Sequence, residues 1–141
     1  MDYMELAEEL LSLRLKTLQI PAVQKLSELE QGEYFVLHYL LIHAEAVHPR
    51  DLSTALAVST ARIAAILKQL EKKKHIRRYI DDTDKRQVIV VLTEAGRERI
   101  EKKHTDVLPY LRSLLEQLEP EDAQSYVRIE REIWNRYIAQ A

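Results

Sequence analysis

The chain of 141 residues contains no cysteine, only two glycines and four prolines. The lack of cysteine excludes disulfides, zinc ribbons, cysteine nucleophiles and thiol redox sensors, and it favours a reducing compartment such as the cytoplasm. The scarcity of glycine and proline favours helices over an all-β sandwich. A chain of this length can form one domain that buries roughly two-thirds of the surface of its unfolded state.

Long apolar runs and a secretory signal are also missing. The first five residues carry acids where a signal would carry Lys or Arg, and no apolar stretch approaches the ~20 residues of a membrane span. The sequence has no Gly-rich phosphate loop, no G-x-S-x-G elbow and no H-E-x-x-H motif. We therefore expect a cytoplasmic protein that is not an enzyme and has no membrane partner.

The formal net charge of −2 hides a basic segment in the middle of the chain. Residues 50–86 contain ten Lys and Arg against five Asp and Glu, a net charge of +5, and the other residues carry −7. A cluster of positive charge indicates a nucleic-acid interface better than the mean charge does. The distribution of charge points to residues 50–86 as the binding region.

Apolar spacing predicts six helices, which cover residues 2–19, 33–46, 50–57, 60–73, 93–118 and 119–140. Pro21 marks either the end of the first helix or the start of the next turn, and Pro109 is expected to kink the fifth. Two runs of β-branched and aromatic residues, 78–80 and 87–92, flank the polar turn 81–86 and predict a hairpin with a charged tip. The last helix carries an apolar stripe that something must cover.

The order short helix, tight turn, second helix and charged hairpin is that of a winged helix-turn-helix. In this arrangement the second helix enters the major groove of DNA and the wing meets the backbone or the minor groove. The predicted fold class is therefore mainly α with a small β-hairpin wing, flanked by helices at both ends.

The predicted helix 60–73 has two distinct faces. Its buried stripe consists of Ile63, Ile66, Leu67 and Leu70, and its outward face of Ala61, Ala65, Lys68 and Lys72, with Arg62 at the edge. Small side chains permit close approach to base edges, and Arg62 can pair with guanine or phosphate. The helix N-terminus at Ser59 and Thr60 can accept a phosphate. The alternative is a solvated, Lys-rich helix end.

Three segments carry a resemblance to a known family. They are L-A-V-S-T-A-R-I-A-A-I-L-K-Q-L-E-K-K-K-H-I-R-R (56–78), D-D-T-D-K-R (81–86) and V-L-T-E-A-G (91–96). With them, nearly the whole chain resembles the MarR family of bacterial transcriptional regulators. The resemblance implies a triangular homodimer in which the first, fifth and sixth helices interlock. It also implies repression at a palindromic operator, relieved by a small-molecule effector.

On this resemblance the chain is one MarR-like domain, residues 1–141. The winged unit covers about 33–92, and the dimerisation helices cover about 2–20 and 93–140. The dimerisation residues expected on these helices are Leu6, Leu10, Tyr126, Ile133, Trp134 and Tyr137.

The resemblance also implies which residues bind double-stranded DNA. It assigns Ser59, Thr60 and Arg62 to the major-groove reader, and Arg86 to the wing residue that reaches the minor groove, oriented by Asp84. The full set is Ser59, Thr60, Ala61, Arg62, Ala65, Lys68, Lys72, Asp84 and Arg86. The alternative for Asp84 and Arg86 is a salt-bridged turn that contacts nothing.

Three positions depart from the family pattern. Ala64 and Ala65 stand where many relatives have Thr or Ser followed by Arg, so more of the DNA affinity is expected to be electrostatic. Lys74 replaces a Gly that usually ends the reading helix, a left-handed position that costs a non-Gly residue on the order of 1 kcal/mol. Ala57 replaces the common turn Gly, which it can do if its dihedrals stay helical.

The family places effector pockets between the dimer helices and the winged unit. Residues that could line one here are Tyr34, Phe35, Tyr39, Tyr110 and Leu111, although aromatic residues at such positions are also ordinary core. The five histidines, at 38, 43, 48, 75 and 104, lack the spacing of a helical ligand pair. We therefore expect neither a metal site nor a cofactor.

A second hypothesis is a protein-interaction module, because winged helices also bind proteins and the net charge is negative. The location of the basic excess favours DNA instead, since a protein-binding wing need not be cationic.

Overall fold

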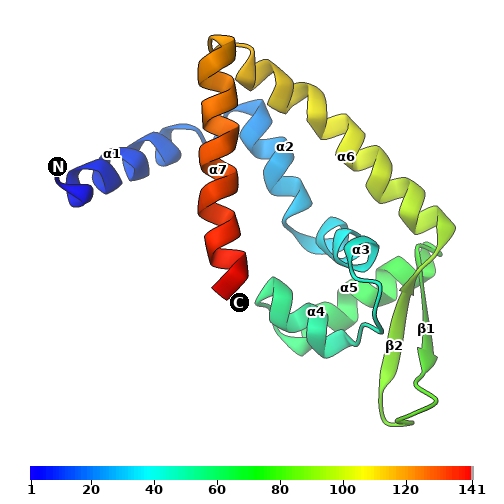
Figure 1. Ribbon diagram of the computed structural model, residues 1–141. Helices are drawn as coiled ribbons and strands as arrows, with labels where there is room; N and C mark the ends of the chain where they lie inside the picture. The colour runs from blue at the N-terminus through cyan, green and yellow to red at the C-terminus, as the bar shows by residue number, and fades with distance from the viewer. Residues whose placement is uncertain (141) are drawn as a thin grey trace.

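The computed structural model describes residues 1–140, which form seven helices and one two-stranded antiparallel sheet (Figure 1). In chain order the elements are α1 (Tyr3–Lys16), α2 (Pro21–Leu29), α3 (Gly32–Ile42), α4 (Pro49–Leu56), α5 (Thr60–Lys72), β1 (Ile76–Ile80), β2 (Val88–Leu92), α6 (Glu94–Leu115) and α7 (Pro120–Gln140). The predicted fold class, mainly α with a small hairpin wing, is confirmed. None of these helices is apolar enough over a sufficient length to cross a membrane.

One hydrophobic core joins α3, α4, α5, the sheet and the first half of α6. Its largest fully buried side chains are Val36 and Leu37 of α3, Leu52 of α4, Ile63, Leu67 and Leu70 of α5, Ile76 and Val90 of the sheet, and Ile100 of α6. The stripe predicted for helix 60–73 is buried in full. This winged unit is complete within a single chain.

The helix-turn-helix is built from α4 and α5. Pro49 occupies the first position of α4, where its missing N–H costs nothing. Ser59 caps α5, because its Oγ accepts a hydrogen bond from the Arg62 backbone N–H at 3.1 Å. Between the helices, Ala57 has φ 57° and ψ 44°, which is left-handed rather than helical. The expectation for Ala57 was wrong: the turn requires a conformation that glycine adopts more readily.

A second left-handed residue connects α5 to the sheet. Lys74 has φ 63°, as expected from its place in the sequence. The Thr93 hydroxyl donates to the Lys74 carbonyl at 2.7 Å and accepts from the Gly96 N–H at 3.1 Å, so this side chain caps α6 and holds the turn. A Cβ on Gly96 would lie 2.1 Å from the His75 carbonyl oxygen, so only glycine allows α6 to pass so close to the backbone.

Several predicted boundaries are corrected by tertiary contacts. The chain after α1 forms a separate helix, α2, with Pro21 at its first turn. Helix α3 ends at Ile42 rather than at residue 46, because the following segment extends and Val47 accepts a hydrogen bond from the Val90 N–H at 2.9 Å. Strand β1 begins at Ile76, two residues before the predicted run, since Ile76 pairs with Leu92. Helix α6 continues through Pro109.

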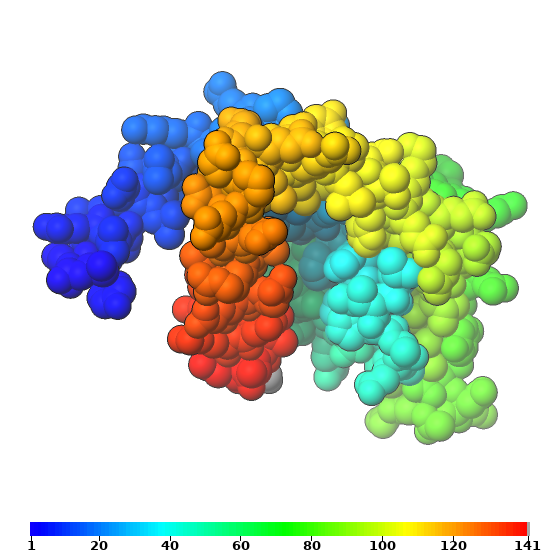
Figure 2. All heavy atoms as spheres, turned by 45° about the horizontal axis from the view of Figure 1, so that its top comes forward, coloured from blue at the N-terminus to red at the C-terminus, as the bar shows by residue number. Residues whose placement is uncertain are grey.

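The terminal helices stand apart from this core. Neither α1 nor α7 contains a buried residue, and α1 projects from the body of the molecule (Figures 1 and 2). The salt bridge between Arg14 and Glu130, at 3.8 Å, connects the two helices. Their exposed apolar residues include Leu6, Leu10, Leu11, Tyr126, Ile133, Trp134 and Tyr137.

Candidate nucleic-acid interface

Helix α5 presents one fully accessible face. The outward residues predicted from the sequence, which are Ala61, Arg62, Ala65, Lys68 and Lys72, are all exposed, as are Ser59 and Thr60 at the N-terminus. The small residues lie toward the N-terminal half of the helix and the lysines toward its C-terminal half. Such a face allows close approach at one end and contact with phosphate at the other.

The wing turn is held by its own side chains. The Asp81 carboxylate accepts hydrogen bonds from the backbone N–H and the hydroxyl of Thr83, and these bonds lower the pKa of Asp81. Asp84 Oδ1 lies 3.1 Å from the backbone N and 3.2 Å from Nε of Arg86. The Arg86 side chain is 90% exposed. Asp84 therefore orients an arginine that projects into open space.

The base of the wing is attached to the start of α4. Nδ1 of His48 donates to the Val88 carbonyl at 2.8 Å, and Nε2 of the same ring lies 4.0 Å from the Asp81 carboxylate. The His48 backbone N–H donates to Asp51 at 2.8 Å. One residue thus fixes the helix-turn-helix relative to the wing that carries Arg86.

Cations between α4 and the wing are mostly free of carboxylate partners. Within residues 1–140, no acidic side chain forms a salt bridge with Arg50, Arg62, Lys68, Lys72, Lys74, Arg77 or Lys85. Most cations of α6 and α7, by contrast, pair with a glutamate or aspartate one turn away. Unpaired cations are available to phosphate groups without first breaking an ion pair.

Four of these free cations were not predicted as site residues. Arg50 lies in the first turn of α4, Lys74 between α5 and β1, Arg77 on β1 and Lys85 in the wing turn. The sequence alone contains only a general signal for them, the local excess of Lys and Arg. Two neighbours with the same charge are paired instead, Lys73 with Glu33 at 2.8 Å and Arg78 with Glu71 at 2.9 Å.

An ion-pair network ties the end of α5 to α3 and α6. The Glu33 carboxylate accepts from Lys73 and from Arg99, both at 2.8 Å, and Arg99 donates to Nδ1 of His75 at 3.2 Å. Burial by itself raises the pKa of Glu33, but the hydrogen bonds from both cations outweigh it and lower the pKa. Burial, then Arg99 and Lys73, lowers the pKa of His75. The network holds the end of the reading helix in place.

The five residues expected to line an effector pocket do not form one cluster. Tyr34 lies beneath two cations, with Arg99 4.8 Å and Lys103 4.9 Å from its ring centroid. Phe35 and Tyr39 pack against each other with centroids 6.1 Å apart. Tyr110 lies on α6 with Lys25 5.8 Å from its ring.

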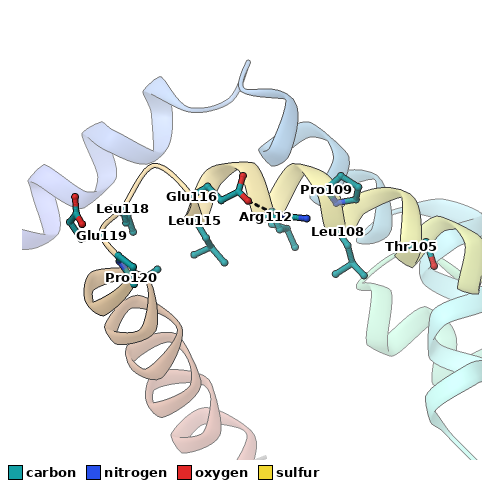
Figure 3. A pocket seen from close by; sticks show the side chains of 11 residues that line it. Thr105, Leu108, Pro109, Arg112, Leu115, Glu116, Leu118, Glu119 and Pro120 are labelled. Atoms are coloured by element: carbon teal, nitrogen blue, oxygen red, sulfur yellow. Dashed lines mark hydrogen bonds and ion pairs between the residues drawn. The ribbon is translucent and has the colours of Figure 1, made fainter.

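Leu111 borders two apolar cavities near the terminal helices. One, of about 1080 Å³, is an open groove at the corner between α6 and α7 (Figure 3). Leu108 and Leu115 point to the same side of α6 there, and the Arg112–Glu116 ion pair lies beside them. The other, of about 420 Å³, lies among α1, α2, α6 and α7 and is lined by Leu10, Leu26 and Tyr126, among others.

The histidines do not form a metal centre in the described part of the chain, where no three metal-ligating side chains come together. Two of them nevertheless meet: Nδ1 of His38 lies 3.1 Å from Nε2 of His104. The sequence offered no signal for this contact, because the residues are 66 positions apart and on different helices.

Comparison with known protein families gives a match that includes the helix-turn-helix and the wing. The family described as "Winged helix DNA-binding domain" matches residues 33–111. This chain belongs to that winged helix DNA-binding family. The match includes α4, α5 and the wing, so the surface described above lies within the DNA-binding domain.

Individual relatives agree with the family. The Bacillus subtilis protein YdgJ, named an uncharacterized HTH-type transcriptional regulator, is 30% identical over 90 residues, which are 64% of this chain and 55% of YdgJ. The curated relatives are thus matched over about half of their length or less. The likeness of this winged helix chain to them therefore covers only part of each relative.

Solved structures share the fold over nearly the whole chain. MepR, described as a transcription regulator of the Staphylococcus aureus multidrug efflux pump MepA, has a TM-score of 0.70 at 23% identity and covers 92% of this chain and 97% of its own. A MepR mutant bound to an oligodeoxyribonucleotide has a TM-score of 0.60 at 25% identity, covering 97% of this chain and 99% of its own. The fold implied by the resemblance to the MarR family is thus found over nearly the whole chain, and the family match confirms its winged helix DNA-binding part.

Proposed function

We propose that this protein is a sequence-specific transcriptional regulator that represses by binding a palindromic operator as a homodimer, with repression relieved by a small molecule. The observation that carries the proposal is the exposed face of α5 together with the exposed Arg86 of the wing, which Asp84 orients. An operator-binding role also fits the cytoplasmic location expected from the sequence.

We assign the major groove to α5 and the minor groove to the wing. Arg62 is placed at the N-terminal part of the reading face, where a guanidinium can form a bidentate pair with guanine. Ala61 and Ala65 allow close approach, and Lys68 and Lys72 reach phosphates. Arg86 is favoured in a narrow minor groove by its negative potential, with Asp84 fixing its geometry.

The terminal helices support the homodimer. Apolar residues on α1 and α7 are exposed in the single chain, with Trp134 at 53% and Tyr137 at 66%. Contiguous exposed apolar surface of this extent is typical of protein–protein interfaces. A second copy of the chain is the partner that would cover Leu6, Leu10, Tyr126, Ile133, Trp134 and Tyr137.

An apolar small molecule is the effector class that the cavities at Leu111 favour. The 420 Å³ cavity is of ligand size and is lined mainly by leucine and valine side chains, with Tyr126 as its one aromatic residue. Because it touches both terminal helices and α6, a bound molecule would change how these helices pack. A role for Tyr34, Phe35, Tyr39 and Tyr110 in the same response stays a prediction.

The DNA proposal is tested by selecting bound sequences from a random duplex pool, followed by a salt titration of the winner. A palindrome with half-sites about one helical turn apart, bound with a steep salt slope, is expected. Arg62→Ala should cost about 1–3 kcal/mol of binding free energy and should change the base preference at one position in each half-site. Arg128→Ala on α7 is the control and should leave binding unchanged.

Two outcomes would change the proposed role of Arg62 or the proposal of operator binding itself. Equal losses for Arg62→Ala on every duplex would make Arg62 a phosphate contact rather than a base reader. The absence of any enrichment, with no binding at low salt, would contradict the proposal and favour a protein-interaction module.

The homodimer is tested by the mass in solution. Trp134→Asp places a charge on the exposed apolar stripe of α7 and is expected to halve the mass or to unfold the chain. Asn135→Asp, one residue further on the same helix, adds the same charge and should leave the mass unchanged. A folded Trp134→Asp variant that keeps the dimer mass would show that the interface lies elsewhere.

A further inference from the structure

Two histidines from distant parts of the chain meet where the winged unit joins α6. Nδ1 of His38, on α3, lies 3.1 Å from Nε2 of His104, on α6, and the rings meet edge to face with centroids 5.2 Å apart. Both residues are half-buried. Neither residue has a part in the DNA contacts or in the dimer interface proposed above.

The distance requires a hydrogen bond between the two imidazoles, so one nitrogen must carry a proton and the other must be free. A neutral pair meets this condition, and so does a pair that shares one added proton. A second added proton would place two N–H groups and two positive charges about 3 Å apart in a partly buried site, where like charges repel strongly. The contact therefore tolerates at most one positive charge.

His43, which caps the end of α3, acts on His38 through its charge. Glu33 and Tyr34 on α3 and Arg99 and Lys103 on α6 lie within five positions of the pair along the two helices, and Glu28 on α2 contacts Lys103. Both carboxylates are already engaged, Glu33 with Arg99 and Glu28 with Lys103. His43, whose Nδ1 lies 2.8 Å from the Tyr39 carbonyl oxygen, is itself basic and opposes added charge on His38. No neighbour in this set stabilises a doubly protonated pair.

The His38–His104 contact joins α3 of the winged unit to α6, the helix that leads to the terminal helix α7. Helix α3 packs in the same core as the reading helix α5, and α6 starts directly after the wing and leads to α7 (Figure 1). Separation of α3 from α6 would change the position of the reading helix relative to the dimerisation helices. The spacing of two half-site readers depends on that position.

We propose that the His38–His104 contact is a proton-sensitive coupling between the winged unit and α6, so that acidification loosens α3 from α6 and weakens operator binding. The DNA-binding part of this inference rests on the proposed function. The protonation part rests on the histidine pair alone.

The surroundings of His38 determine whether stability rises or falls with pH. Burial, then the charges of His104 and His43, lowers the pKa of His38. The unfolded chain takes up the proton at the ordinary pKa of about 6.5, whereas the folded chain resists it. Stability from this site is therefore present above about pH 6.5 and is lost as the pH falls below it toward the lowered pKa.

The test uses two substitutions that keep hydrogen-bonding capacity and remove titration. His38→Asn places an amide near the position of Nδ1, and His104→Gln places one near Nε2. His43→Gln removes an exposed histidine from the same helix and is the matched control. His48 and His75 remain in every variant, so their titration is common to all.

Affinity for the selected duplex is measured from pH 8 to 5.5 at constant ionic strength. We expect the unmodified protein to lose several-fold more affinity than the double variant over this range, because protonation of the pair disfavours the packed state in which α3 contacts α6. His43→Gln removes a charge that opposes protonation of His38 but leaves the pair in place, so it should keep most of the unmodified protein's response. The same pH dependence in the double variant and the unmodified protein would overturn the coupling, as would a response abolished by EDTA, which would indicate a bridging metal.

An NMR titration of the imidazole protons needs no DNA and separates the two proposals. We expect His38 to titrate below its usual range and to move back toward it in His104→Gln. An ordinary His38 titration that is unchanged in His104→Gln would show that the pair does not form, whatever the protein binds. A clear His38 shift together with no duplex selected would instead reject operator binding and its coupling while leaving the pair intact.

Discussion

The winged unit buries its apolar residues, whereas the terminal helices leave theirs exposed. In the winged unit, Leu37, Leu52 and Leu67 are completely buried. On α7, Ile133 remains 43% exposed and Trp134 53% exposed, although their helical spacing is just as regular. An amphipathic helix is therefore stable within one chain only where another element covers its apolar face. The first region buries its apolar residues within one chain, and the second leaves an apolar surface uncovered in the single chain.

Removal of a core side chain should show the largest effect of this difference. Leu67→Ala is expected to cost about 2–5 kcal/mol of the free energy of unfolding, because it leaves a cavity in the core. Chemical denaturation measures this loss. Ile138→Ala, at a residue 72% exposed, should cost much less free energy of unfolding in the single chain. The size of its effect should depend on protein concentration. Equal, concentration-independent losses for both variants would contradict the comparison.

A second substitution tests how tightly the winged unit is closed. Gly96→Ala would place a methyl group 2.1 Å from the His75 carbonyl oxygen and 2.8 Å from Cδ1 of Leu92. We expect a loss of about 1–3 kcal/mol of stability from this overpacking. The neighbouring exposed Ala95, changed to Ser, is the control and should be near neutral. An unchanged melting temperature for Gly96→Ala would show that α6 can move away from His75.

A third substitution should stabilise the winged unit. Ala57→Gly removes the cost of a left-handed alanine and is expected to gain roughly 0.5–1 kcal/mol. Ala55→Gly, in the body of α4, should lose a similar amount because glycine weakens a helix. Thermal unfolding of the two variants should therefore shift in opposite directions. A loss for Ala57→Gly would mean that the turn relaxes to another conformation in solution.

The smallest effect on stability is expected at the wing. Arg86→Ala should change the free energy of unfolding by less than about 0.5 kcal/mol, because the side chain is 90% exposed and its ion pair with Asp84 lies at the surface. DNA affinity should nevertheless fall. Calorimetry and binding measured on the same sample separate the two effects. A large loss of stability would indicate that the Asp84–Arg86 turn serves the fold instead.

Much of the winged unit could be predicted because local signals agreed with one another. The buried stripe of α5, its first residue Thr60 and the hairpin that follows it are all found as the sequence indicated. Each of these depends on residues a few positions apart, so helical or strand periodicity is sufficient to find them.

Other features of the fold could not be predicted from local sequence patterns. The end of α3 depends on the pairing of Val47 with Val90, and the closeness of α6 to the backbone depends on His75 meeting Gly96. Helix α2 was not expected as a separate helix, although Pro21 does begin a helical turn, as one of the two alternatives had it. All of these are decided by contacts between segments that local periodicity does not connect.

The order of the residues was sufficient for the class of fold, the bounds of α5 and the position of the wing turn that carries Arg86, because hydrophobic period and turn chemistry act over short distances. Tertiary structure decided which cations are free, with Lys73 and Arg78 paired and Arg50 and Arg77 unpaired. It also brought His38 to His104 across 66 residues. Ion pairs and imidazole contacts need atoms within a few ångströms, and only the packed chain determines those distances.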